Sequence, residues 1–187
     1  MLHNLRIGTR LAAGFSLVLL FTAVIGVAAV FSAQALSGLT RALYEHPFKV
    51  TRALLTADTD VLRISTTLRG TLLAHDSGAI DSAASQIEQL DKTAFEQLAI
   101  AYAQSLGNQQ GIQVIGDALR NWKPTRDKVI ALARSGKLED AIASLNDKAG
   151  PQVIAIQQNF DKALDFAHNK AELFMQSSDA ASSRTIG

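Results

Sequence analysis

The chain has 187 residues, of which 48% are apolar and 19% are charged. This composition excludes a disordered chain, because enough apolar surface is available to offset the entropy lost on ordering. Eighteen Lys and Arg residues against 17 Asp and Glu leave a net charge of +1, so we expect no nucleic-acid partner. The absence of cysteine excludes disulfides, thiol catalysis and thiolate metal ligands.

An apolar stretch without charges lies near the N-terminus, between Arg10 and Arg41. As a helix, residues 11–31 would reach about 32 Å, and the hydrocarbon core of a bilayer is about 30 Å thick. We therefore predict a transmembrane helix over residues 11–32, in contact with a lipid bilayer.

The positive charges that flank this stretch predict its orientation. Arg6 and Arg10 precede it, and the stretch itself offers no competing positive charge. The positive-inside rule then places residues 1–10 in the cytoplasm and exports residues 33–187.

Two other interpretations of the apolar stretch remain open. A secretory signal peptide also has a basic start and an apolar run, and Ala33, Gln34 and Ala35 fit a cleavage site. The apolar run is longer than the usual length of about 7–15 residues in such a peptide. A buried core helix is the third interpretation, but a helix that is apolar on every side rarely suits a small soluble domain.

Four amphipathic helical patterns follow the apolar stretch, and no strand-like alternation persists. They cover about residues 50–68, 80–106, 112–133 and 153–174, with a short amphipathic piece at 138–145. The first pattern has apolar residues at alternating steps of four and three, which is typical of a bundle seam. Its seam residues are Val50, Leu54, Ala57, Val61, Ile64 and Leu68.

Residues that break or cap helices separate these patterns, at 75–78, 107–111, 135–136 and 150–151. Long helices with short connections predict an all-α fold, in which the transmembrane helix continues into an antiparallel, up-down four-helix bundle. Pro47 disfavours helical geometry at His46, so we expect a kink there.

The sequence shows no motif for catalysis or for metal binding. No two histidines are spaced three or four residues apart, and no nucleophile elbow, Walker A or dinucleotide-binding motif occurs. We therefore expect no enzymatic activity, no cofactor and no metal.

Three short segments resemble bacterial methyl-accepting chemotaxis receptors. Residues 4–11 (NLRIGTRL) and the apolar run after them look like the start of such receptors. Residues 44–48 (YEHPF) resemble the first periplasmic helix of their four-helix-bundle sensor domains. Residues 135–141 (SGKLEDA) match a segment after the third helix of those domains. From the first of these segments to the end of the fourth helical pattern, the resemblance extends over nearly the whole chain.

The resemblance implies a homodimer that forms through the first bundle helix, in the bacterial inner membrane with a periplasmic sensor domain. It also implies a partner that is either a small-molecule ligand or a periplasmic binding protein. The second membrane helix, HAMP relay and signalling rod of the family are not among the 187 residues, so we expect the chain to be part of a longer receptor.

Two alternative functions remain open. The same sensor type is also attached to histidine kinases and diguanylate cyclases. A self-contained, membrane-anchored bundle that binds a periplasmic partner is the other alternative.

A set of arginines and threonines shares the side of the first bundle helix opposite the seam. At about 100° per residue, the members lie within about 80° of one another. They are Arg52, Thr56, Thr59, Arg63 and Thr66. The resemblance implies that this surface faces the second copy across the dimer axis and that ligand binds between the copies.

Arginine pairs well with carboxylates, and threonine hydroxyls can complete the hydrogen bonding. We therefore predict that this face binds a small anionic molecule, such as an amino acid or organic acid. Arg69 lies about 120° around the helix from Arg63 and would serve only at the rim. The alternative interpretation is a solvated polar face.

Three other residues have chemistry that could serve a site. Arg126 occupies a seam position between Trp122 and Val129, and we expect its side chain to snorkel to solvent, with an internal pocket as the alternative. We expect Trp122 to pack in the core. We interpret His46 as a residue at a helix end rather than a pH sensor.

Overall fold

The computed structural model describes residues 7–43, 48–74, 76–105 and 107–185. The chain forms two compact units, Met1–Ala42 and Leu43–Gly187. The kink predicted at Pro47, the role of His46 and the continuity of the membrane helix with the bundle all fall on residues outside the described ranges.

The first unit contains α1 (Ile7–Leu43). Within this helix, the segment Gly14–Phe31 has a mean hydropathy of 2.5, and none of it is buried. A helix of this length and composition can cross a bilayer, which is a property that membrane anchors and signal sequences share. Its apolar side chains are exposed, which argues against the interpretation as a core helix.

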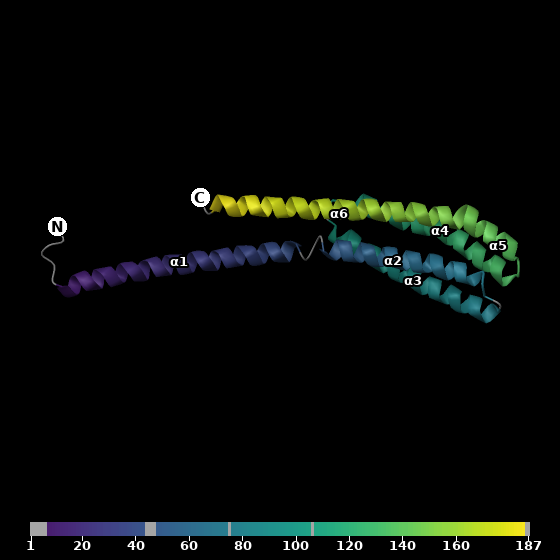
Figure 1. Cartoon of the computed structure of the whole chain (residues 1–187), viewed down its shortest axis with the longest axis horizontal. Helices are drawn as coiled ribbons and strands as arrows, with labels where there is room; N and C mark the ends of the chain where they lie inside the picture. Colours follow the sequence, from purple (N-terminus) through teal and green to yellow (C-terminus); the bar gives the residue numbers. More distant parts are fainter. Residues whose placement is uncertain (1–6, 44–47, 75, 106, 186–187) are drawn as a thin grey trace. The chain divides into compact units, whose positions relative to one another are not determined.

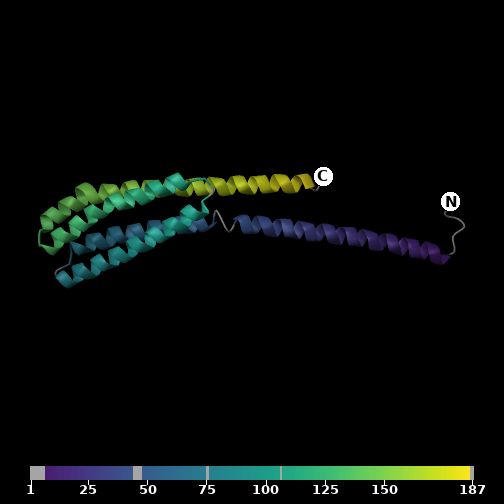
Figure 2. The same cartoon turned by 180° about the vertical axis from the view of Figure 1, so that it is seen from behind.

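The second unit is a bundle of long helices (Figures 1 and 2). Its elements are α2 (Lys49–Thr71), α3 (Ser77–Gln104), α4 (Gln109–Arg134), α5 (Leu138–Ser144), the π-helical turn η2 (Leu145–Ala149) and α6 (Gly150–Thr185). Helix α2 packs most extensively against α3 and also contacts α6, while α4 contacts α3, α5 and α6. Among the described residues there is no strand. The predicted all-α fold with a four-helix bundle is confirmed.

The apolar seam of α2 lies in the core of the bundle. Leu54, Val61 and Leu68 are completely buried, as are Trp122 of α4 and Phe160 of α6. All six seam residues that the sequence predicts are buried. Trp122 packs in the core as predicted.

Two connections show why the helices end where they do. After α4, Gly136 has a positive φ of 71°, its N–H donates to the Ala133 carbonyl, and the Lys137 N–H donates to the Leu132 carbonyl. These two bonds form the Schellman motif, which needs a left-handed residue and therefore favours glycine. The turn predicted at residues 135–136 is confirmed.

The sequence also predicts a break at residues 150–151, and there the structure differs. The chain stays helical from α5 through η2 into α6, and the Gly150 N–H donates to the Leu145 carbonyl, one residue beyond the α-helical partner. Pro151, the second residue of α6, has no N–H and therefore cannot donate to a carbonyl of the preceding helical turn. A wide π-helical turn therefore replaces the expected break.

The α2–α3 connection depends on Asp76, the N-cap of α3, whose carboxylate accepts a hydrogen bond of 2.7 Å from the Ala79 N–H. We expect Asp76→Ala to lower the free energy of unfolding by about 1 kcal/mol, because an N–H at the helix start loses its acceptor. Chemical denaturation followed by circular dichroism measures this change. Asp76→Ser keeps a capping oxygen and should retain most of the stability. Equal destabilisation by both substitutions would contradict the capping role.

Candidate functional site

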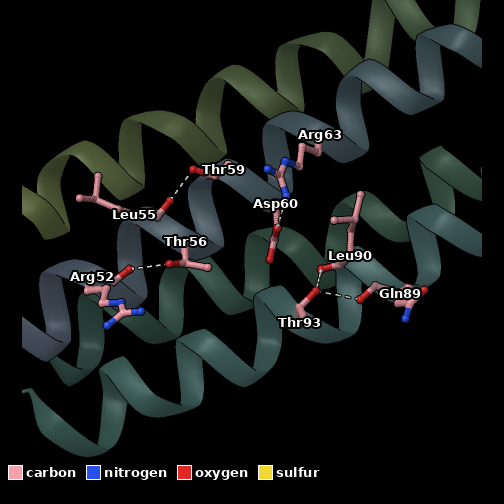
Figure 3. A network of polar contacts seen from close by, with 9 residues as sticks. All are labelled: Arg52, Leu55, Thr56, Thr59, Asp60, Arg63, Gln89, Leu90 and Thr93. Atoms are coloured by element: carbon pink, nitrogen blue, oxygen red, sulfur yellow. Dashed lines mark hydrogen bonds and ion pairs between the residues drawn. The ribbon is translucent and has the colours of Figure 1, made fainter.

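The residues predicted to bind an anion lie exposed on α2. Arg52, Thr56, Thr59, Arg63 and Thr66 all have exposed side chains on the helix face that points away from the core. Figure 3 shows the first four of them along the helix. A shallow groove on α2 is lined by Arg52, Thr56, Thr59 and Arg63, and Thr66 lies outside it.

The threonine hydroxyls on this face donate to their own helix. The Thr56 hydroxyl bonds the Arg52 carbonyl at 2.9 Å, and the Thr59 hydroxyl bonds the Leu55 carbonyl at 2.8 Å. Thr66 bonds the Leu62 carbonyl at 3.0 Å in the same way. In this arrangement the hydroxyl oxygens can accept hydrogen bonds from a ligand, but a hydroxyl must rotate before it can donate to a carboxylate.

An acidic residue that the sequence reasoning missed also lines the groove. The Asp60 side chain is only 8% exposed, and its Oδ1 lies 3.9 Å from the Nη1 of Arg63, whose side chain is 67% exposed. Figure 3 shows Asp60 on the side of α2 toward Thr93 of α3. Its spacing of three residues before Arg63 is the one sequence signal that could have indicated this pairing. Asp60 therefore offsets part of the positive charge of the groove.

An apolar stripe runs beside these arginines. Phe48, Leu55 and Leu62 follow one another at intervals of seven residues, and 53%, 50% and 41% of their respective surfaces are exposed. Seven-residue spacing on an exposed face is the pattern of a second seam, which a helix uses to pack against a partner. We call Phe48, Leu55 and Leu62 the outer stripe of α2.

A carboxyl group at the α2–α6 interface has an unusual pKa. Burial raises the pKa of Asp58 above its ordinary value of 3.8, and the negative charge of Asp161 on α6 raises it further. The Oδ1 atom of Asp58 is buried and has no hydrogen-bond partner among the described residues. Both effects disfavour the ionised form of Asp58 in the folded protein.

This shift makes a pH-dependent prediction. The pKa of Asp58 is higher in the folded state than in the unfolded state, where it is near 3.8, so between these two values the folded state binds more protons. The free energy of unfolding therefore falls as the pH rises through the range between the two pKa values. We expect Asp58→Asn to raise the melting temperature at pH 7, and the gain to shrink as the pH is lowered toward 4. Thermal melts of both proteins across this range test it. A gain that does not change with pH would contradict the assignment.

Arg126 does not snorkel to solvent, so that expectation is wrong. Its side chain is 1% exposed, and its Nη2 donates to Asp91 Oδ1 of α3 at 2.6 Å. Its guanidinium carbon lies 4.6 Å from the centre of the Trp122 ring. The aspartate partner and the aromatic face compensate the buried charge, so the side chain has no need to reach water. Arg126 also lines a groove between α3 and α4, whereas the alternative interpretation was an internal pocket.

No group of three or more His, Asp or Glu side chains within the described ranges is arranged to hold a metal ion. The α2 face presents exposed arginines and threonines beside one buried carboxylate.

The chain matches a model of a known protein family. A model described as "Four helix bundle sensory module for signal transduction" matches residues 4–182, which is nearly the whole chain. No curated protein and no solved structure matches the chain. The family match confirms the resemblance that the sequence motifs indicate.

Proposed function

Because the chain belongs to the family of four-helix-bundle sensory modules for signal transduction, we propose that it senses a small anionic molecule for a bacterial chemotaxis receptor. An amino acid or an organic acid is the expected ligand. The observation that carries this proposal is the pair of exposed arginines, Arg52 and Arg63, in one groove on a helix face that no other bundle helix covers. Arginine guanidinium groups are well suited to bind carboxylates.

In this proposal the first unit contains a membrane span and the second unit is exported. The apolar segment Gly14–Phe31 would span the inner membrane with the N-terminus in the cytoplasm. The bundle would then lie in the periplasm, where it meets the ligand or a binding protein that carries it. Its role is to report occupancy rather than to catalyse a reaction.

We further propose that two copies pair through α2. Isolated exposed apolar residues are common on protein surfaces, but the outer stripe repeats with the seven-residue period of helix–helix packing. Pairing along this stripe would bring the grooves of the two copies toward each other. A ligand carboxylate could then contact arginines from both copies.

Ligand binding would signal by favouring one arrangement of the two copies over another. Helix shifts of about 1–2 Å are typical of such transitions. A coupling free energy of about 1–3 kcal/mol is sufficient to bias a downstream output. The ligand must therefore contact the two arrangements differently, as it would when it bridges the two copies.

Removing one arginine tests the site. We expect Arg63→Ala to weaken binding at least about tenfold, because a charge-assisted hydrogen bond to the ligand is lost. Calorimetric titration of the full chain in nanodiscs with L-aspartate, L-glutamate, succinate and citrate measures the affinity. Arg120→Ala is the matched control: it removes an exposed arginine of α4 that lies outside the groove, and it should bind as the unmodified chain does. Equal affinity in Arg63→Ala and the unmodified chain would reject the site, and no binding by any acid would reject an anionic ligand.

The proposed dimer can be tested by cross-linking, because the chain contains no cysteine. We expect Leu62→Cys to form a disulfide-linked dimer on mild oxidation in membranes, since a disulfide needs its two Cα atoms within about 7 Å. Val114→Cys introduces a thiol at a similarly exposed position on α4, where 46% of the valine surface is exposed. Gel electrophoresis should show a dimer only for the first variant. Equal cross-linking of both would indicate random collision rather than a specific interface.

A further inference from the structure

A second group of polar side chains lies away from the α2 face. It lines a groove of about 580 Å³ between α3 and α4. The floor of the groove includes Arg126, and its charged lining includes Glu88 and Asp91 of α3 with Lys123 and Asp127 of α4. None of these residues lines the groove on α2.

The hydrogen bonding of Arg126 is incomplete. A guanidinium carries five N–H donors, and this one makes a single charged hydrogen bond, from Nη2 to Asp91. Its Nε and Nη1 are buried and have no hydrogen-bond partner within the described part of the chain. Buried donors of a charged group are costly to leave unpaired, so their burial beside a groove indicates an acceptor from another molecule.

The other charges of the groove restrict what this molecule can be. Lys123 lies 3.7 Å from Asp127, and Asp91 is paired with Arg126. Asp81 and Arg134, which also line the groove, are paired with each other at 2.7 Å. Glu88 forms no ion pair with any residue that the structure describes, although it lines the same groove. A simple anion would meet the carboxylates of Glu88, Asp91 and Asp127, and a simple cation would meet Arg126.

We propose that this groove is a second binding site, for a small zwitterion such as a free amino acid. Its carboxylate accepts a hydrogen bond from Nη1 of Arg126, and its ammonium group pairs with Glu88. Because Nη1 is covered, the carboxylate enters as side chains at the mouth of the groove move aside. The site lies within one copy of the chain and does not depend on the α2 face.

Trp122 provides the readout for a test. It is the single tryptophan of the sequence, and Arg126 is stacked on its ring, so its fluorescence responds to changes at the guanidinium. The full chain in detergent micelles is titrated with each common L-amino acid. An amino acid that binds is then compared with the hydroxy acid that lacks its ammonium group and the amino alcohol that lacks its carboxylate.

We expect a saturable fluorescence change with at least one amino acid and about tenfold weaker binding of both analogues, since each lacks one charged contact. No saturable change with any amino acid would overturn the proposal. Equal binding of the hydroxy acid would overturn the role of Glu88, and therefore the proposal that the ligand is a zwitterion.

Two variants separate this site from its surroundings. Glu88→Gln removes the exposed carboxylate without touching the buried ion pair, so we expect an unchanged melting temperature and about tenfold weaker binding. Arg63→Ala alters only the α2 face and should leave the fluorescence titration unchanged. Unaltered binding by Glu88→Gln would overturn the proposal. Loss of the fluorescence change in Arg63→Ala would also overturn it, and would assign the fluorescence signal to the α2 face instead.

Discussion

Leu54, Val61 and Leu68 recur at every seventh position of α2 and are completely buried between the helices of the bundle. Because successive helical residues are rotated by about 100°, burial of this seam also fixes the direction of the side chains on the opposite side of the helix. Arg52 and Arg63 must then point outward, next to the exposed outer stripe. The packing of the core and the chemistry offered to a ligand are thus two consequences of one periodic pattern.

The same reasoning explains how much could be predicted from the sequence. Seam burial and the outward direction of the arginines depend on the helical period, which a single segment carries within itself. Helix ends such as the one at Gly136 depend on the conformational preferences of a few neighbouring residues. These features were predicted correctly because no distant part of the chain decides them.

The features that were missed all depend on contacts between helices. The partner of Arg126 is Asp91, which lies 35 positions away on α3, and only the packing of α3 against α4 brings the two together. Asp60 is buried because α3 covers one edge of α2, whereas Thr59 and Arg63 on the same helix remain exposed. The continuous passage from η2 into α6 likewise overrides the local preference of Gly150 and Pro151 for a break. Tertiary contacts, rather than residue type, determine these outcomes.

The interfaces of the bundle differ in what they contribute to a sensing movement. Helix α2 has its most extensive contact with α3, where apolar burial opposes separation. At the α2–α6 contact, Asp58 and Asp161 place two like charges near each other, and one buried carboxylate oxygen lacks a partner among the described residues. Like charges and unpaired polar atoms weaken a contact, so the α2–α6 contact opposes helix movement less strongly than the α2–α3 contact does. A ligand on α2 that acts by moving helices would therefore act most readily through α6, the last helix of the bundle.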